Sequence, residues 1–224
     1  MKTKTPGLWA LRAVRSGFTM VELLAVIAVI AILMSVAAVG IQKMDQGQAT
    51  STGLSVSEAL FDEARSAAIG RGTRSRVYLH NDPSPEQRDR FLRFMAVATL
   101  EEGDWTFSNR GTTLPPGVYF DELATDEATG KVDDIGSYGT ATIALPGDKR
   151  SQVTCIYYEF NAEGICVREE TPGSPGAAFV ISGGILPPGQ TQVKVKGNNR
   201  TGFVVWRNGR TSIFRNPEHI TTSN

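Results

Sequence analysis

The chain has 224 residues with 23 basic and 23 acidic side chains, so its formal net charge is zero. This balance gives no overall indication of a nucleic-acid partner, because such proteins concentrate positive charge. After a long apolar segment near the N-terminus, about 180 residues remain, which is the size of one domain.

The N-terminal segment combines a basic end with a long apolar stretch. Residues 1–17 have no acidic side chains but four basic ones: Lys2, Lys4, Arg12 and Arg15. Residues 18–41 contain one charged side chain, Glu22. As a helix they would span about 36 Å, enough to cross a hydrocarbon core of about 30 Å. The positive-inside rule then predicts a cytoplasmic N-terminus and an exported C-terminal part. An acid inside hydrocarbon costs at least ~2.5 kcal/mol, so Glu22 indicates a function.

The sequence Gly17-Phe18-Thr19-Met20-Val21-Glu22-Leu23-Leu24 resembles the prepilin-type cleavage and methylation motif of type IV pilins and type II secretion pseudopilins. The resemblance implies that prepilin peptidase removes residues 1–17 as a leader by cutting after Gly17. It further implies that Phe18 becomes N-methylated and that Glu22 assists assembly. A buried charge needs a partner, so we expect Glu22 to pair with the Phe18 ammonium of its own or a neighbouring subunit. The mature chain would have 19 basic and 23 acidic side chains, a net charge of −4.

A second processing route stays open. Ser35-Val36-Ala37 has the small-x-small pattern of a signal peptidase site. Secretory apolar regions usually have about 7–15 residues, however, and this one is longer and contains Glu22. A methylated Phe18 at the mature N-terminus would support the prepilin route, and a start near Ala38 would support conventional secretion of a β-rich protein.

The segment after the apolar stretch predicts a connection followed by a helix. Residues 42–55 are rich in Gly, Gln, Ser and Thr and indicate a flexible or weakly helical connection. Ser55-Val56-Ser57-Glu58 has the pattern of a capping box. Residues 56–72 then predict an amphipathic helix, with its helical core at about 56–69 and a cap at Gly70 or Gly72. Its predicted apolar face consists of Leu54, Phe61, Ala64 and Ala68.

Two shorter stretches resemble one particular group within these pilin-like proteins. Residues 63–72 resemble the helix end of the minor pseudopilin H group, and residues 114–118 resemble a loop-to-strand step of that group. The resemblance implies a pilin-like fold and a role in a type II secretion pseudopilus.

From Arg74 onward the apolar pattern has a period of two, and turn-forming residues separate the segments. Asn208-Gly209 predicts a two-residue type I′ hairpin turn. We therefore expect an α+β fold. Its N-terminal transmembrane helix continues, with or without a kink, into an amphipathic helix packed on an antiparallel β-sheet, and residues 73–224 form a β-rich periplasmic domain. The predicted strands are 76–80, 91–98, 105–107, 118–120, 141–145, 153–160, 165–168, 177–181, 192–196, 203–206 and 211–214.

The two cysteines, Cys155 and Cys166, belong to a predicted hairpin whose turn lies at residues 161–164. With Phe160 opposite Ile165, the cysteines would be separated by about 13 Å along the strands. A disulfide needs Cα atoms within about 7 Å. This register predicts two free, buried thiols, and a different register would leave a disulfide as the alternative.

No nucleophile motif, phosphate loop or metal-ligand spacing accompanies the two histidines, His80 and His219. We expect no enzyme activity, no cofactor and no metal, and we expect His80 to be a surface or partly packed histidine. Residues 121–134 contain six acids, which indicate a solvated loop. Calcium binding is the alternative, although the spacing differs from an EF-hand.

Residues 190–224 contain six basic side chains and one acid, a local charge of +5. Arg207, Arg210 and Arg215 are therefore candidate nucleic-acid contacts, and a simple solvent-exposed strand face is the alternative. The sequence as a whole predicts a minor pseudopilin in the inner membrane. Its expected partners are prepilin peptidase, other pseudopilins and secretion cargo. A minor type IV pilin for adhesion or DNA uptake is the alternative function.

Overall fold

The computed structural model describes residues 18–131, 138–147, 152–167 and 176–215. The chain divides into two compact units, Met1–Lys43 and Met44–Asn224. A single helix, α1 (Met20–Arg71), begins in the first unit and ends in the second. The strands of the second unit pair antiparallel throughout the described residues, and this confirms the predicted α+β class.

Helix α1 is continuous through residues 42–55, which corrects the predicted flexible or weakly helical connection. Tertiary packing explains the difference. Leu54 is buried, and a Cβ atom on Gly53 would meet the side chains of Val118 and Ile181 at 3.1 and 3.2 Å. The glycine thus lets the helix approach the sheet closely. Its low helix propensity is overridden by the packing that it permits.

The second half of α1 follows the prediction at its face and at its end. Leu54, Phe61, Ala64 and Ala68 are all buried. The helix ends at Arg71, and Gly72 adopts the left-handed conformation (φ +63°) of a C-terminal cap.

The predicted capping box at Ser55 is wrong, because Ser55 lies inside the helix. Its hydroxyl donates to the carbonyl of Ser51 at 3.2 Å. Glu58, the other half of that predicted box, instead accepts a hydrogen bond from Thr211 at 2.7 Å.

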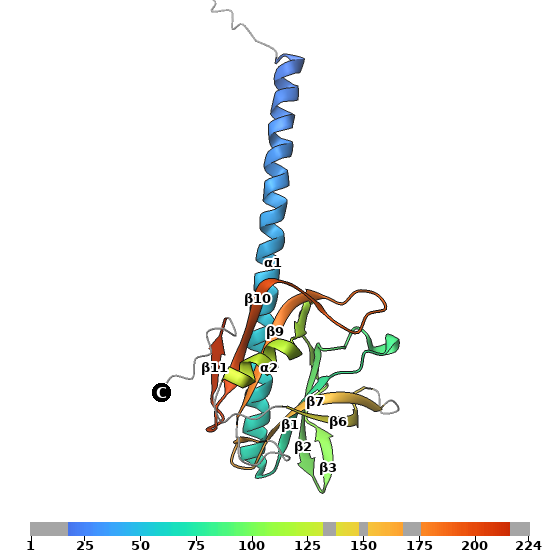
Figure 1. Cartoon of the computed structure of the whole chain (residues 1–224), viewed down its shortest axis with the longest axis vertical. Helices are drawn as coiled ribbons and strands as arrows, with labels where there is room; N and C mark the ends of the chain where they lie inside the picture. The colour runs from blue at the N-terminus through green and yellow to red at the C-terminus, as the bar shows by residue number, and fades with distance from the viewer. Residues whose placement is uncertain (1–17, 132–137, 148–151, 168–175, 216–224) are drawn as a thin grey trace, which may run out of the picture. The chain divides into compact units, whose positions relative to one another are not determined.

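Two antiparallel sheets form most of the second unit besides α1 (Figure 1). The first has the order β3-β2-β1-β7-β6, with β4 on β2 and β8 on β7. The second has the order β11-β10-β9-β5. The strands of the first sheet are β1 (Ser75–His80), β2 (Phe94–Glu101), β3 (Asp104–Phe107), β4 (Thr112–Thr113), β6 (Gly139–Ala144), β7 (Gln152–Phe160) and β8 (Cys166–Val167). Those of the second are β5 (Val118–Phe120), β9 (Ala177–Ile185), β10 (Lys194–Val205) and β11 (Thr211–Phe214). A 3₁₀ turn, η1 (Pro85–Gln87), follows β1.

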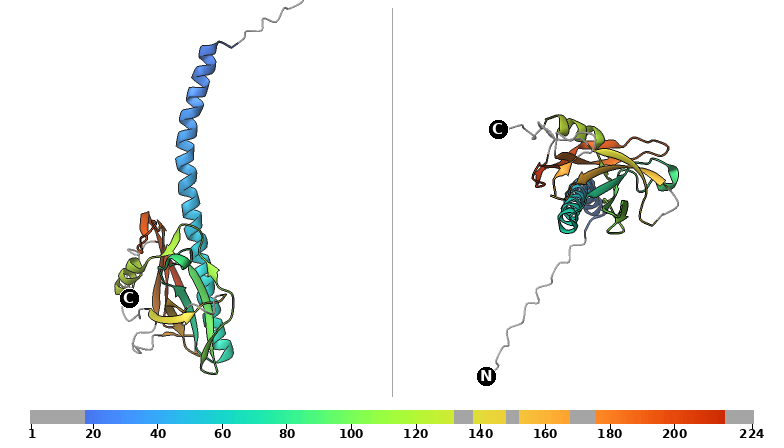
Figure 2. Two further views of the ribbon diagram at one scale, coloured as in Figure 1. Left: turned by 90° about the vertical axis from the view of Figure 1, so that its right-hand side faces the viewer. Right: turned by 90° about the horizontal axis from the view of Figure 1, so that it is seen from below.

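The main core joins α1 to both sheets. Figure 2 shows the second half of α1 running alongside the strands of this unit. The Phe61 ring on α1 is the centre of this core. Ring centroids of Tyr158 and Phe160 on β7 lie 5.0 and 6.2 Å away, and those of Phe179 on β9 and Phe203 on β10 lie 5.3 and 4.9 Å away. One helical side chain therefore contacts residues of both sheets.

A second helix, α2 (Glu122–Lys131), occupies most of the segment predicted as an acidic loop at 121–134. Asp121 precedes it, and its Oδ1 accepts a hydrogen bond from the Ala124 amide at 3.0 Å. Ala124 and Ala128 are buried in a small cluster with residues of β9, β10 and β11. The prediction was wrong because the acids obscured this alanine spacing of four, which places both alanines on one helical face.

Two hairpins differ from prediction in detail. In the β7–β8 hairpin, Phe160 lies opposite Cys166 rather than Ile165, a shift of one residue. In the β10–β11 hairpin, the Trp206 amide donates to the Arg210 carbonyl at 2.9 Å, so residues 207–209 form a three-residue connection instead of the predicted two-residue turn. Of the turn residues, Gly209 (φ +73°) has a positive φ and Asn208 does not. The connection is therefore a type I turn followed by a left-handed glycine, and not the predicted type I′ turn, which needs two positive φ values.

Candidate functional site

The first turn of α1 is organised by Thr19 and Glu22. The Oε2 atom of Glu22 accepts hydrogen bonds from the Thr19 amide and the Thr19 hydroxyl, both at 2.9 Å. The Glu22 amide donates in return to the Thr19 hydroxyl at 3.2 Å. Because the helix begins at Met20, Thr19 is its N-cap and Glu22 its third residue. These contacts form a capping box, which satisfies otherwise unpaired amides of the first turn.

The Glu22 carboxylate is consequently fixed at the start of the helix, close in sequence to Phe18. A negative charge there is favourable, because the N-terminal end of a helix has a partial positive charge. The Phe18 side chain is 85% exposed. Gly17, the predicted last leader residue, lies outside the described residues, as does the rest of segment 1–17.

Sequence reasoning missed the role of Thr19. The signal was present, since Thr19-Met20-Val21-Glu22 has the Ser/Thr-x-x-Glu pattern of a capping box. It was assigned instead to Ser55, where the chain is already helical.

The first turns of α1 present apolar side chains on all sides. Every residue from Phe18 to Ser35 is exposed within the described structure. A helix that is apolar all round normally becomes buried in a membrane or in a larger assembly. Among the described residues, no helix combines the length and the apolar character that crossing a membrane requires. The span predicted at 18–41 stays a prediction.

Both cysteines are free and buried, as predicted. Burial raises the pKa of Cys155 to about 12, and burial likewise raises the pKa of Cys166 to about 12. Neither thiol therefore forms a reactive thiolate near neutral pH. The two cysteines are packing residues of the sheet.

His80 is fully buried, which corrects its prediction as a surface or partly packed residue. It ends β1, where it lies opposite Cys155 of β7. Burial lowers its pKa below the ordinary value. His219 lies outside the described residues.

The acidic segment predicted as a solvated loop or calcium site contains a paired acid. Asp121 is buried, and its Oδ2 accepts a hydrogen bond from Arg200 Nε at 3.1 Å. This ion pair joins the start of α2 to β10. Residues 132–137, which contain Asp133 and Asp134, lie outside the described residues.

The three candidate nucleic-acid contacts lie on or next to the β10–β11 hairpin. Arg207, Arg210 and Arg215 are all exposed. Arg207 and Arg210 belong to the turn, whereas Arg215 follows β11. The structure thus places two of these cations at the turn of the hairpin and the third at the far end of β11.

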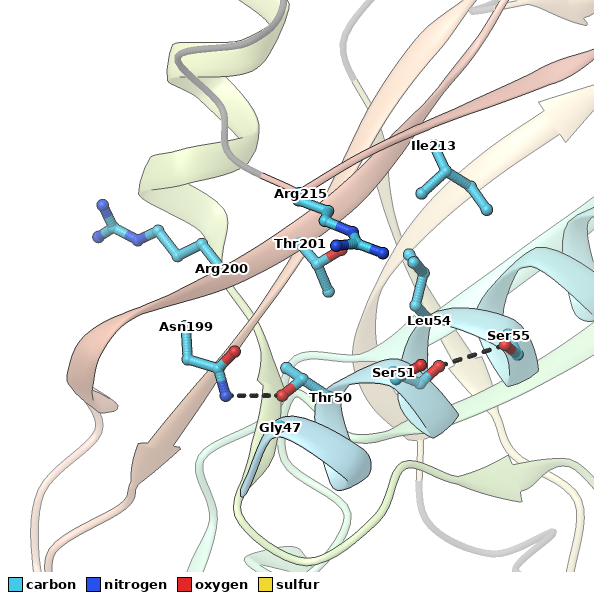
Figure 3. A pocket seen from close by; sticks show the side chains of 10 residues that line it. All are labelled: Gly47, Thr50, Ser51, Leu54, Ser55, Asn199, Arg200, Thr201, Ile213 and Arg215. Atoms are coloured by element: carbon cyan, nitrogen blue, oxygen red, sulfur yellow. Dashed lines mark hydrogen bonds between the residues drawn. The ribbon is translucent and has the colours of Figure 1, made fainter. Parts of the chain in front are cut away.

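A pocket of about 410 Å³ lies between residues 47–55 of α1 and the strands β10 and β11 (Figure 3). Its polar side includes Thr50, whose hydroxyl accepts a hydrogen bond from Asn199 Nδ2 at 2.7 Å. The Arg215 guanidinium points over the pocket, while Arg200 turns away from it. The lining residues are Gly47, Thr50, Ser51, Leu54, Ser55, Asn199, Arg200, Thr201, Ile213 and Arg215.

Comparison with known proteins identifies the N-terminal segment. Residues 12–38 match the family model described as the Prokaryotic N-terminal methylation motif. No curated protein and no solved structure matches the chain. The matched residues include Phe18, Thr19 and Glu22, and the motif implies processing by prepilin peptidase and assembly with pilin-like proteins. The chain therefore has a type IV prepilin-like N-terminal methylation motif followed by an α+β domain.

Proposed function

We propose that the protein is a minor pseudopilin, a structural subunit of a type II secretion pseudopilus that takes part in protein export. The observation that supports this most directly is the position of the methylation motif at residues 12–38. The motif overlaps the start of α1, and residues 18–35 are all exposed and mostly apolar. Such a surface needs a partner, and a pilin-like filament or a membrane would provide it.

Processing would create the charge that assembly needs. In the precursor, the Phe18 nitrogen is a neutral amide, and the capping box holds the Glu22 carboxylate at the amide of the next residue, Thr19. Cleavage after Gly17 would convert the Phe18 amide to an ammonium group. A Glu22 carboxylate in a low-dielectric surrounding could then capture the Phe18 ammonium of an incoming subunit, because an unpaired buried charge is costly.

In this proposal the protein is not an enzyme. It is anchored in the inner membrane by residues 18–41, and its C-terminal domain lies in the periplasm. Prepilin peptidase, other pseudopilins and secretion cargo are its partners.

The N-terminus of the mature protein tests the proposal. The full chain would be purified from membranes of a host with prepilin peptidase and from a host without it. We expect N-methylated Phe18 in the first and the intact precursor in the second, by N-terminal sequencing and intact mass. A mature start near Ala38 would show conventional secretion instead and overturn the proposal.

A second candidate is a minor type IV pilin that takes part in DNA uptake or adhesion. It is favoured by the exposed Arg207, Arg210 and Arg215 on or next to one hairpin. Under this function, the full-length protein in detergent would bind duplex DNA, and log Kd would depend linearly on log salt. Replacing the three arginines by alanine should abolish binding, whereas Arg110→Ala, at another exposed position, should not.

A further inference from the structure

The turn between β2 and β3 is unusual in its backbone and in its charge. Glu101 and Asp104 are the last paired residues, so Glu102 and Gly103 form a two-residue turn. Both have positive φ values, +52° and +96°. Such turns favour Asn, Asp or Gly. A glutamate is held here in a conformation that its side chain disfavours, and this kind of strain is concentrated at functional positions.

This turn is exposed, and it has more carboxylates than basic side chains to pair with them. Glu101, Glu102 and Asp104 are all exposed. Glu101 pairs with Arg71, the last residue of α1. Within the described part of the chain, Glu102 and Asp104 have no ion-pair partner. Two carboxylates are therefore available for a ligand or a partner protein.

The pocket beside α1 has an arginine and hydroxyl groups, which complement the acidic charge of the β2–β3 turn. Arg215 is exposed and forms no ion pair with any described residue. Its guanidinium points over a pocket that also presents the hydroxyls of Ser51 and Ser55 (Figure 3). Leu54 and Ile213, of which the second is 54% exposed, give the pocket an apolar side. The pocket can thus receive a small polar turn that has a carboxylate.

The acidic turn and the pocket lie at opposite ends of the same domain. The Arg71–Glu101 pair places the turn at the C-terminal end of α1. The pocket is lined by Ser51, which lies 20 residues earlier in the same helix. Residues 51 and 71 are about 30 Å apart along a helix axis. Figure 1 shows the β2–β3 hairpin beside the end of α1. The turn of one molecule therefore cannot enter its own pocket.

We propose that the β2–β3 turn of one copy docks in the α1–β11 pocket of a second copy, where Arg215 donates hydrogen bonds to the Glu102 carboxylate. This inference rests on the proposed pilin-like function. Two different surfaces at opposite ends of a molecule make a head-to-tail contact that repeats from copy to copy. Such a contact builds an open filament where the rotation between copies does not close a ring, and it does not build a symmetric dimer. The charge pair gives that contact its specificity.

Engineered disulfides in the full-length protein test the contact. Glu102→Cys and Arg215→Cys would be made in separate, differently tagged copies that are expressed together and oxidised in membranes. A disulfide needs Cα atoms within about 7 Å, and the native Cys155 and Cys166 are buried. We expect a mixed dimer with both tags, and we expect the double variant to form a ladder of multimers. Glu163→Cys, at another exposed acid, is the matched control and should give no mixed dimer with Arg215→Cys.

Charge exchange provides a second readout. Glu102→Arg and Arg215→Glu should each cause loss of multimers trapped by an amine-reactive cross-linker, and combining them should restore those multimers. If the wild type forms multimers but the Glu102→Cys and Arg215→Cys copies form no mixed disulfide, the docking contact is overturned and the pilin-like function stands. A Glu102→Cys cross-link only to a different protein, or one equally efficient from Glu163→Cys, would also overturn the contact. Absence of wild-type multimers would overturn the contact alone, because the proposed function is decided separately by the N-terminus of the mature protein.

Discussion

Thr19 and Glu22 close the first turn of α1 with three hydrogen bonds between them. The same carboxylate that the proposed function assigns to assembly therefore also starts the helix. These two roles make different demands, because the capping role needs only an acceptor oxygen whereas the assembly role needs a negative charge.

Glu22→Gln separates the two roles. Glutamine at the third helical position can still complete a capping box, so the helix should begin normally and the leader should be removed. Without the charge, the variant should not enter filaments, and Glu22→Ala should likewise be processed but not assembled. Mass spectrometry of the N-terminus and cross-linking in membranes measure the two outcomes. Normal assembly of Glu22→Gln would show that the charge is not required.

Glu159 is expected to be the most stabilising acid in the sheet. It is buried, its Oε2 lies 2.6 Å from Arg76 Nε, and its Oε1 lies 3.2 Å from Arg74 Nη1. The Arg76 guanidinium also lies 4.1 and 3.9 Å from the Trp105 and Tyr157 ring centroids. Removing one partner of a buried pair costs about 3–5 kcal/mol. We expect Glu159→Ala to lower the free energy of unfolding by about that amount.

Urea unfolding of the full-length protein in detergent, followed by tryptophan fluorescence, measures this effect. Glu101→Ala is the matched control, because its pair with Arg71 is about half exposed and should contribute less than about 1 kcal/mol. Equal losses for the two variants would contradict the assignment.

Gly209 is predicted to be required by contacts as well as by its conformation. Gly209 and Gly189 have almost the same φ, +73° and +72°. A Cβ atom on Gly209 would collide with Arg65 Nε and with the Gly164 carbonyl, whereas one on Gly189 would meet nothing within 4 Å. Alanine at either position should cost about 1–2 kcal/mol for the left-handed backbone.

Gly209→Ala should therefore lose a further ~1–3 kcal/mol from the collision, relative to Gly189→Ala. Thermal unfolding of both variants under the same conditions measures the difference. Equal melting temperatures would mean that the Arg65 side chain and the Gly164 carbonyl both move away at no cost.

His80 gives the fold a predicted dependence on pH. Burial lowers its pKa in the folded state below the ordinary value. The unfolded chain then binds the proton more tightly, so stability is complete above about pH 6.5 and falls as the pH drops below it. His80→Asn should have a shallower loss of stability between pH 7 and 5 than the wild type. An unchanged slope would assign the pH dependence to the carboxylates instead.

The sequence indicated the fold where a local pattern and the packing agreed. The apolar face of α1 through Phe61, Ala64 and Ala68 was predicted, and so were most strands. It was misleading where a distant contact decided the outcome. Gly53 belongs to the segment predicted to be flexible or weakly helical, yet its missing side chain permits close packing against Val118 and Ile181. The sequence alone does not distinguish a glycine that weakens a helix from one that lets the helix pack closely against a sheet.

The candidate site divides in the same way. Phe18 and Glu22 were evident from a contiguous motif, whereas the pocket at Arg215 was not. Its lining comes from two segments of chain about 150 residues apart, and no spacing rule connects them. The burial of His80 likewise depends on strands that neighbour it only after folding.

The hydrogen bond from Thr211 to Glu58 joins residues 153 positions apart in sequence. At 2.7 Å, this bond connects β11, the last described strand, to α1. During synthesis and export, the Glu58 side of α1 therefore lacks this contact until β11 has emerged. A chain shortened before β11 would leave the Glu58 carboxylate without its hydrogen bond from Thr211.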